Sequence, residues 1–336
     1  MKCINRKQRG VPHALKTGIP VMLACLMLSG CTNRNELADA YRIYDTSDSY
    51  QLTSSIVQNQ VSLMAEDLCV GGTKNTVSDA VHADYAESAA VFSVDDEEIT
   101  YAKNIYERRY PASTTKILTA YAALKYGNLE DVLTVSQEAI DSLMYGSSIC
   151  GLQPGDQLTL EQALYGLMLC SGNDAANVIA EHISGSTEKF AELMNEEALQ
   201  LGAIQSHFTN AHGLPDENHY TTAYDLYLIF NAALKDERFV NYISTKKYDT
   251  SYQNASGETV NQVWFNTNGY LKGTYDEPEN VTVVGGKTGT TDEAGSCLVL
   301  FSKNQSDKPV ISIVLKGDSK SHLYSLMTEL LTNFSN

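Results

Sequence analysis

The chain has 336 residues, of which 43% are hydrophobic, with 22 glycines and only 7 prolines. This composition excludes fibrous and mainly disordered proteins, and the length suffices for one large domain or two ordinary ones. The formal net charge of −17 argues against nucleic acid or anionic lipid as the main partner, because both repel an acidic surface.

Residues 1–30 have the pattern of an export signal. Five basic residues and no acidic residue precede Ile19, and the apolar segment 19–28 is too short to span a membrane. The sequence Leu28-Ser29-Gly30-Cys31 then resembles the lipobox of bacterial lipoproteins, where the signal is cut before a cysteine that carries a diacylglycerol. We therefore expect a lipoprotein signal peptide, lipidation of Cys31, and an exported protein anchored by lipid to the outer face of the cell membrane. The alternative is an ordinary secretory signal followed by a chance cysteine.

Residues 31–87 are expected to hold the lipidated cysteine and a tether. From residue 32 to about residue 55 the sequence is polar, with no sustained apolar period. Residues 56–87 are ambiguous, because scattered apolar residues suggest a short helix that Gly71-Gly72 would interrupt. We therefore place the start of the catalytic-type domain near Ser88 and extend it to residue 336.

Four cysteines lie beyond the predicted anchor, namely Cys69, Cys150, Cys170 and Cys297. None forms a Cys-x-x-Cys pair, so a zinc ribbon or a thioredoxin-like motif has no support. Disulfides and free thiols both remain open, because nothing in the sequence fixes a pairing.

The domain is predicted to contain strands near its two ends and helices between them. A hairpin is expected over 89–102, with its turn at Asp95–Glu98. Residues 128–200 are predicted to be mostly helical, with helices at 158–169, 175–183 and 188–201. Strands are expected at 281–284, 297–301 and 309–315, followed by a last helix with apolar residues at helical spacing. We therefore predict an α+β fold with one sheet closed by both ends of the domain.

The stretch Pro111-Ala112-Ser113-Thr114-Thr115-Lys116 directly precedes an apolar helix predicted from Ile117. Ser113 and Lys116 are three residues apart, which places their side chains about 5–6 Å from one another on one helix face. A lysine can activate a serine only when it is neutral, so its pKa must fall from about 10.4 toward roughly 7–8. We predict that Ser113 is a nucleophile and Lys116 its base, whereas an isolated match would indicate a capping serine and a solvated lysine.

Two further motifs follow in the chain. Ser171-Gly172-Asn173 stands at the end of an apolar helix, and Lys287-Thr288-Gly289-Thr290 follows a strand. Ser-x-x-Lys, Ser-x-Asn and Lys-Thr-Gly in this order are the motif set of penicillin-binding proteins and serine β-lactamases. Ser171 and Asn173 are expected to relay a proton and hold a peptide carbonyl. Lys287 is expected to keep Lys116 neutral and to attract an anionic substrate.

The chain resembles the low-molecular-mass penicillin-binding proteins, the serine-type D-alanyl-D-alanine carboxypeptidases of peptidase family S11, over about residues 89–315. Supporting segments are Gly146-Ser147-Ser148, Leu152-Gln153-Pro154-Gly155-Asp156, Ser171-Gly172-Asn173-Asp174-Ala175, His212-Gly213-Leu214 and Thr221-Thr222-Ala223-Tyr224-Asp225.

The resemblance implies a β-lactamase/transpeptidase-like fold, an antiparallel sheet flanked by helices with a helical subdomain. It also implies removal of the terminal D-alanine from peptidoglycan stem peptides through an acyl-enzyme on Ser113, which penicillin would also acylate. Residues Lys287, Thr288, Gly289 and Thr290 would bind substrate, with the backbone N–H groups of Ser113 and Thr290 as the oxyanion hole. No cofactor is expected. Endopeptidase and transpeptidase activities differ only in leaving group or acceptor, and the motifs do not separate them.

Many relatives carry a β-rich domain after the catalytic one. The residues after Gly289 suffice only to finish the sheet and one helix, so we expect this chain to lack that domain. The lipid on Cys31 would then replace the membrane attachment.

Three other functions share some of these features. A class A β-lactamase has an aspartate where this chain has Gly172, and it needs a glutamate for which Glu192 is the nearest candidate; we interpret Glu192 as helix surface. A non-catalytic penicillin-binding lipoprotein would keep the pocket but lose catalytic residues. All three catalytic motifs are present in this sequence.

A metallopeptidase is the third alternative. His207, His212, Asp216 and His219 are close in sequence, but their spacing fits no helical His-x-x-x-His arrangement. We interpret His207 and His212 as loop or packing residues, and we predict no metal site.

Overall fold

The computed structural model describes residues 68–72 and 74–335. The chain divides into two units, and all of the described residues belong to the second, which begins at Leu63. The predicted signal peptide, Cys31 and most of the tether therefore lie outside the described residues. Within the described ranges, no helix has the length and apolar character needed to cross a membrane.

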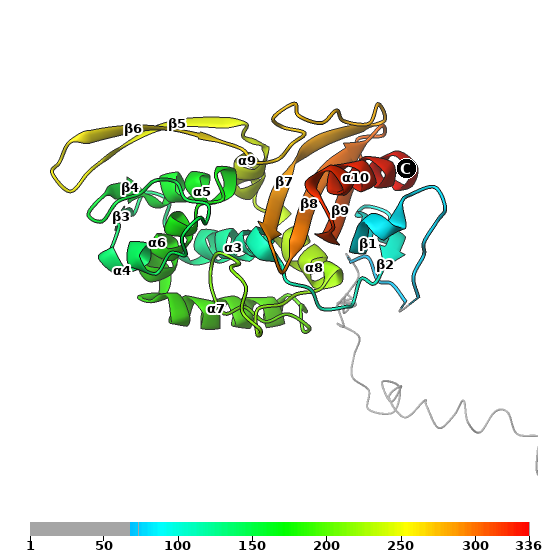
Figure 1. Cartoon of the computed structure of the whole chain (residues 1–336), viewed down its shortest axis with the longest axis horizontal. Helices are drawn as coiled ribbons and strands as arrows, with labels where there is room; N and C mark the ends of the chain where they lie inside the picture. Colours follow the sequence, from blue (N-terminus) through cyan, green and yellow to red (C-terminus); the bar gives the residue numbers. More distant parts are fainter. Residues whose placement is uncertain (1–67, 73, 336) are drawn as a thin grey trace, which may run out of the picture. The chain divides into compact units, whose positions relative to one another are not determined.

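A five-stranded antiparallel sheet forms the centre of the domain, in the order β2-β1-β9-β8-β7 (Figure 1). The expected hairpin is confirmed as β1 and β2, and β1 pairs along its other edge with β9, the last strand. The prediction that both ends of the domain close one sheet is thereby confirmed. The strand bounds are β1 (Ala86–Ser93), β2 (Glu98–Lys103), β7 (Val281–Thr291), β8 (Gly295–Asn304) and β9 (Pro309–Gly317).

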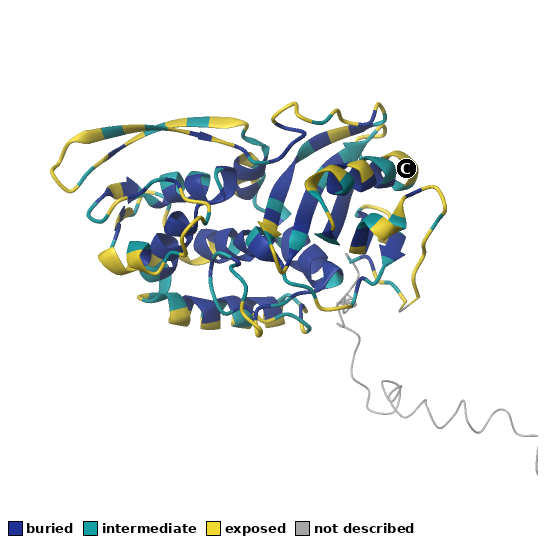
Figure 2. Ribbon diagram, viewed as in Figure 1, coloured by how far each residue is buried: buried dark blue, intermediate teal, exposed yellow. Residues whose placement is uncertain are grey.

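Apolar side chains cover both faces of this sheet, and its strands are largely buried (Figure 2). Because side chains alternate along a strand, Ala90 and Phe92 of β1 join the core shared with the central helices, whereas Ala89 and Val91 face the opposite core. That second core is closed by α10 (Lys320–Phe334), whose buried residues recur at helical spacing. The last predicted helix is therefore confirmed.

The helical part contains the helices predicted from the sequence and three others. Helices α3, α5, α6 and α7 correspond to individually predicted ones. Helix α4 lies within the region predicted to be mostly helical, whereas α8 and α9 lie outside every predicted helix. Their bounds are α3 (Lys116–Tyr126), α4 (Gln137–Asp141), α5 (Leu160–Leu169), α6 (Asn173–Ser184), α7 (Thr187–Gln200), α8 (Ala223–Leu234) and α9 (Glu237–Ser244), with short 3-10 turns η3 (Ala83–Tyr85) and η4 (Ala112–Thr115).

A second sheet, absent from the sequence prediction, has the order β3-β4-β5-β6. Its strands are β3 (Val132–Thr134), β4 (Gln157–Thr159), β5 (Lys247–Gln253) and β6 (Thr259–Phe265). The strands β3 and β4 have only three residues each, which is too short to show a period, and they lie in a region predicted to be mostly helical. Strands β5 and β6 expose alternate residues and bury few, so their apolar signal is weak.

The folded domain begins before the predicted boundary at Ser88. Cys69 is fully buried, and its backbone N–H donates to the Tyr227 hydroxyl at 2.9 Å. Thr76 forms a bridge with Ala102 of β2. Residues 68–72 and 74–87, which the sequence analysis assigned to the tether, therefore pack against the domain, because scattered apolar residues can bury on a sheet edge without forming a periodic element.

Candidate active site

Three segments far apart in the sequence bring polar atoms to the side chain of Lys116. Its Nζ lies 3.1 Å from Ser113 Oγ, 2.7 Å from Asn173 Oδ1 and 2.7 Å from the backbone oxygen of His212. Ser113 lies in η4, Lys116 begins α3, Asn173 begins α6, and His212 lies in the connection before α8. The first two predicted motifs therefore meet at one nitrogen atom.

The surroundings of Lys116 favour its neutral form. The side chain is fully buried, and burial, followed by the nearby charge of Lys287, lowers its pKa well below the ordinary value. A neutral amine has two N–H donors and one lone pair. The oxygens of Asn173 and His212 can accept only from N–H groups, so they take both donors and leave the lone pair for the hydroxyl of Ser113. This is the arrangement that a general base for a serine requires.

The second lysine contacts the second hydroxyl. Lys287 Nζ donates to Ser171 Oγ at 2.9 Å and to the backbone oxygen of Thr288 at 2.9 Å. Burial lowers the pKa of Lys287 to about 7, so charged and neutral forms coexist near neutral pH. The four polar side chains of the first two motifs and Lys287 thus form one cluster with two different protonation sites.

The backbone is strained beside both hydroxyl groups. Ala112, which directly precedes Ser113, has φ of 48°, and Ser171 has φ of 61°. Non-glycine residues in this left-handed region cost about 1–2 kcal/mol, and such strain concentrates at functional sites. Gly213, with φ of 91°, supports the first turn, because a Cβ there would lie 1.8 Å from the backbone oxygen of Ala112.

The third motif lies on β7, the edge strand of the large sheet. A Cβ on Gly289 would lie 2.9 Å from the backbone nitrogen of Ser113, so this glycine lets the strand approach the nucleophile's turn. Gly285 and Gly286 instead make room for backbone atoms of this chain, because a Cβ would meet the oxygens of Ile243 and Val299 at 2.2 and 2.1 Å, respectively.

A cleft of about 330 Å³ opens over the cluster. Ser113 and Thr290, the two predicted oxyanion donors, both line it, as does Asn173. Its outer wall is the loop around Met144, Tyr145 and Ser148, whose two large side chains are exposed. Ser113, Asn173 and Thr290 therefore line one opening, and the buried amine of Lys116 contacts the first two. Lys287 contacts Ser171, which lies two residues before Asn173. Cys31 lies outside the described residues.

Sequence reasoning assigned no role to Asp174, although it belongs to a segment quoted for the family. Its carboxylate accepts from the backbone N–H groups of Cys150, Gly151 and Leu152 at 2.8–3.1 Å. It thereby fixes the wall of the cleft to the start of α6. An acidic residue beside a helix start was the available signal, but it does not reveal which loop supplies the donors.

The profile of the D-alanyl-D-alanine carboxypeptidases, Peptidase_S11, matches residues 73–319. The chain belongs to this family.

Individual members of the S11 family match over most of the described domain. The chain is 35% identical over 253 residues to D-alanyl-D-alanine carboxypeptidase DacF of Bacillus subtilis, which covers 73% of this chain and 61% of that protein. It is 34% identical over 229 residues to the D-alanyl-D-alanine carboxypeptidase of Streptomyces strain K15, covering 65% and 76% of the two chains, respectively. The match thus spans about six tenths of the Bacillus protein's length.

Solved structures agree with the family assignment. The Streptomyces K15 DD-transpeptidase superposes with a TM-score of 0.66 at 32% identity, covering 73% of this chain and 96% of that one. A D-alanyl-D-alanine carboxypeptidase from Mycobacterium tuberculosis superposes with a TM-score of 0.66 at 25% identity, covering 77% and 94% of the two chains, respectively. The predicted transpeptidase-like α+β fold is confirmed.

The S11 chain departs from a class A β-lactamase at both positions considered above. Glu192 is exposed on α7, as expected for a surface residue. A Cβ on Gly172 would lie 2.1 Å from Cys150 Sγ, so the sulfur atom occupies the space that an aspartate would need.

His207 and His219 of this S11 domain make hydrogen bonds within the connection that precedes α8. His207 is exposed, and its Nδ1 lies 2.6 Å from the oxygen of Asn218. The pKa of His219 falls to about 3 through burial, and its Nδ1 accepts from the N–H of Thr209 at 3.1 Å. Among residues 68–72 and 74–335, no group of three or more His, Cys, Asp and Glu side chains is placed to hold a metal ion.

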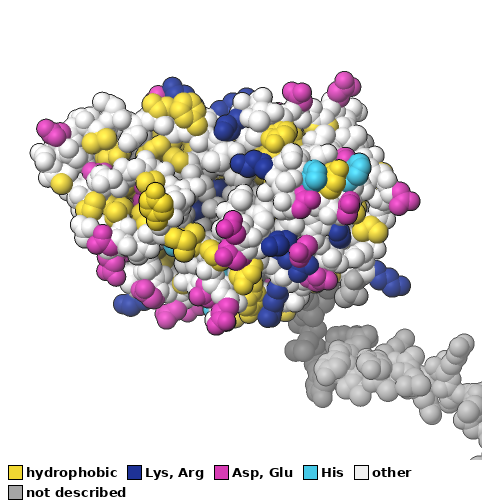
Figure 3. Space-filling model, viewed as in Figure 1, with side chains coloured by type: hydrophobic (Ala, Val, Ile, Leu, Met, Phe, Trp, Pro, Cys, Tyr) yellow, Lys and Arg dark blue, Asp and Glu magenta, His cyan; other side chains and the backbone are white. Residues whose placement is uncertain are grey.

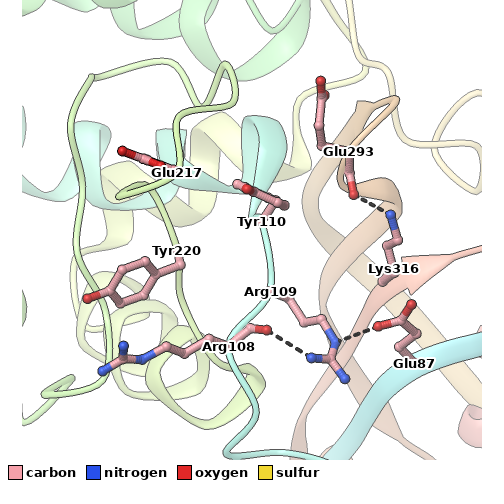
Figure 4. Close-up of a pocket in the computed structure, with 8 residues that line it drawn as sticks. All are labelled: Glu87, Arg108, Arg109, Tyr110, Glu217, Tyr220, Glu293 and Lys316. Atoms are coloured by element: carbon pink, nitrogen blue, oxygen red, sulfur yellow. Dashed lines mark hydrogen bonds and ion pairs between the residues drawn. The ribbon is translucent and has the colours of Figure 1, made fainter.

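A second pocket of about 450 Å³ adjoins the cleft and shares Glu293 with it (Figure 4). Arg109 Nε lies 3.0 Å from Glu87 Oε2, and the guanidinium of Arg108 lies 4.3 Å from the ring centre of Tyr220. These charged groups are paired within the chain, and the eight lining residues include no serine or cysteine. The reactive groups therefore belong to the cleft of Ser113. On the face shown in Figure 3, acidic side chains are spread with Lys and Arg among them.

Proposed function

We propose that this chain is a serine D-Ala-D-Ala carboxypeptidase that removes the terminal D-alanine from peptidoglycan stem peptides. The observation that carries the proposal is the 3.1 Å approach of Lys116 Nζ to Ser113 Oγ, with two carbonyl oxygens on the other contacts of the amine. A D-Ala-D-Ala terminus offers an amide for the serine and a carboxylate for a lysine. The names and the family of the relatives support the same substrate class.

In acylation, Ser113 Oγ attacks the carbonyl carbon of the penultimate D-alanine, and its proton passes to Lys116 Nζ. The backbone N–H groups of Ser113 and Thr290 stabilise the oxyanion. The C–N bond then breaks, and the leaving nitrogen takes the proton from Lys116 by way of the Ser171 hydroxyl. An ester on Ser113 remains, and D-alanine departs as the neutral amine, which takes a further proton from solvent after release.

In deacylation, a water molecule replaces the departed amine. Lys116, neutral again, accepts a proton from this water as it attacks the ester carbonyl. The C–O bond to Ser113 breaks, and the serine recovers its proton from Lys116. A peptide amine in place of water would give transpeptidation by the same steps, so the choice depends on which acceptor reaches the ester.

Substrate binding is assigned to the third motif. The charged form of Lys287 attracts the terminal carboxylate, and Thr288, Gly289 and Thr290 offer an open strand edge to the peptide backbone. Penicillin carries a carboxylate and a strained amide in similar positions. It would therefore acylate Ser113, and its bulky product would block the approach of water.

We extend the proposal to the location of the protein. The sequence of residues 1–30 supports export, and Cys31 is assigned as the lipidated residue that anchors the protein to the outer face of the cell membrane. Growth of cells with a labelled fatty acid, followed by purification, tests this. Label in the wild-type chain and its loss in Cys31→Ser would support the anchor, and an unlabelled wild type would contradict it.

The activity is tested by intact-mass spectrometry of the full chain after incubation with penicillin, and separately with a pentapeptide ending in D-Ala-D-Ala. We expect a lasting penicilloyl adduct that Ser113→Ala lacks, together with release of D-alanine. Rapid turnover of penicillin without an adduct would indicate a β-lactamase instead. An adduct without D-alanine release, with or without an added amine acceptor, would indicate a penicillin-binding protein with no peptidase activity.

A further inference from the structure

Two cysteines face one another beneath the second motif. Cys170 Sγ lies 3.8 Å from Cys150 Sγ. Cys170 follows Leu169, the last residue of α5, and directly precedes Ser171, whereas Cys150 lies two residues after Ser148, which lines the cleft. A disulfide bond is about 2.05 Å long, so the two sulfur atoms need to approach by less than about 2 Å.

The other described cysteines have different surroundings. Cys69 Sγ donates to the backbone oxygen of Ser93 at 3.4 Å, and Cys297 Sγ donates to the backbone oxygen of Ala294 at 3.5 Å. Both are fully buried in the main core, and all four described cysteines are reduced in this structure. The pairing that the sequence left open therefore has one geometric candidate among the described residues.

The backbone holds this pair in place. Asp174 accepts from the N–H of Cys150 at 2.8 Å, and the N–H of Asn173 donates to the oxygen of Ser148 at 2.8 Å. Gly172 leaves the space that Cys150 Sγ occupies, because any Cβ there would overlap the sulfur. The two cysteines thus approach through fixed backbone segments rather than through flexible side chains alone.

We propose that Cys150 and Cys170 form a disulfide that ties the loop at 142–152 to the Ser171-Gly172-Asn173 turn. The oxidant is a disulfide compound, either a small molecule or a protein. This site goes beyond the proposed peptidase activity and does not depend on it.

The chemistry is two successive thiol–disulfide exchanges. Cys170 is partly exposed, and its thiolate attacks one sulfur of the oxidant, forming a mixed disulfide and releasing one thiolate. The Cys150 thiol then loses its proton and attacks Cys170 Sγ, which releases the second half of the oxidant. Two protein thiols are oxidised, one external disulfide is reduced to two thiols, and the two protons that the cysteines lose are taken up by the two released thiolates.

The bond would stabilise a segment that carries strain. It closes a short loop between residues 150 and 170, and it holds the residue next to Ser171, whose φ is 61°. Closing a loop of this length restricts the unfolded chain, so we expect the melting temperature to rise by roughly 5 °C or more on oxidation.

The test uses the full chain equilibrated with glutathione at reduced-to-oxidised ratios from strongly reducing to strongly oxidising. Free thiols are then blocked with a maleimide in denaturant, and the chain is digested without reduction. We expect a cross-linked peptide containing Cys150 and Cys170, two hydrogens lighter than the separate peptides, while Cys69 and Cys297 remain blocked by maleimide. The melting temperature is measured at each ratio.

Matched variants separate the bond from other effects of oxidation. Cys69→Ser should keep the oxidation-dependent rise in melting temperature, whereas Cys150→Ser should abolish it. The proposal is overturned if Cys150 and Cys170 both carry maleimide at the most oxidising ratio, or if they pair with other cysteines. A cross-link without any rise in melting temperature would overturn the tying role. Because the readouts are mass and melting temperature, a failure of the peptidase assay would leave this test intact.

Discussion

Asn173 Oδ1 lies 2.7 Å from Lys116 Nζ, at the point where the start of one buried helix meets the start of another. The contact is an acceptor facing a lysine whose pKa burial depresses. A neutral acceptor orients the amine without charging it. The identity of residue 173 as an amide, rather than a carboxylate, therefore favours the neutral form of Lys116, which its proposed role as a base requires.

We expect Asn173→Asp to slow acylation of Ser113 by penicillin at neutral pH by about 10²-fold or more, because an adjacent carboxylate favours charged Lys116 and raises its pKa. The rate should recover as the pH rises and the lysine deprotonates. Stopped-flow acylation with a fluorescent penicillin between pH 6 and pH 10 checks this. Glu192→Gln, on the exposed face of α7, is the control and should match the wild type. A pH-independent loss in Asn173→Asp would refute the explanation.

The titration of Lys287 adds a pH dependence of the rate to the one expected from Lys116. Its pKa of about 7 means that the charged form is present below that pH and is lost above it. For a peptide with a free terminal carboxylate, kcat/KM should therefore fall as the pH rises through about 7, because kcat/KM reports the free enzyme. A peptide with an amidated terminus should react slowly and lack this limb. The same limb in both peptides would show that Lys287 does not read the carboxylate.

Two substitutions at Ser171 distinguish the role of its hydroxyl group from that of its backbone conformation. Ser171→Ala and Ser171→Gly both remove the hydroxyl, and we expect each to lower the acylation rate by about 10²-fold or more. At φ of 61° a glycine is unstrained, so Ser171→Gly should be about 1 kcal/mol more stable than Ser171→Ala. Urea denaturation and acylation kinetics on both variants test the two statements. Wild-type activity in either variant would remove the hydroxyl from the mechanism.

Two glycines with positive φ should respond very differently to alanine. At Gly213 a Cβ would lie 1.8 Å from the oxygen of Ala112, so Gly213→Ala should destabilise the fold by at least about 3 kcal/mol. At Gly146, with φ of 82°, nothing lies within 4 Å of the added Cβ, and we expect a cost of only about 1 kcal/mol. Melting temperatures of the two variants provide the measurement. Equal losses would mean that the turn at Ala112 can move aside.

Much of the fold was predictable from the spacing of apolar residues and from the order of the elements along the chain. The hairpin at the start of the domain, the helix after Ser113 and the last helix all show a clear apolar period, and each forms where expected. The strands β5 and β6 were not predicted because they form a largely exposed hairpin. Polar side chains such as Asp249 and Ser251 there interrupt the alternation of apolar and polar residues that marks a strand. The short strands β3 and β4 are specified by pairing with distant segments, which no local window contains.

The site was predictable as a set of side chains but not as a geometry. The three motifs name the proposed nucleophile Ser113, both lysines and the Ser171–Asn173 pair, and the structure brings these side chains together. The backbone oxygen of His212 was missed because every residue has a backbone carbonyl group, so the residue type does not indicate which one contacts Lys116. The strained φ of Ala112 was missed for a similar reason, because an alanine in the sequence does not indicate a left-handed backbone conformation.

The pairing of β1 with β9 joins the first and last strands of the described domain. Ribosomes make the Ser113 segment early, but the strand carrying Lys287 and the partner strand of β1 come last. Contacts that join distant parts of a chain form slowly, because the intervening segment must be closed before they hold. A polypeptide that ends before β7 therefore lacks Lys287, whose charge contributes to the lowered pKa of Lys116. We expect the sheet that carries Lys287 to close only when nearly the whole domain has been synthesised.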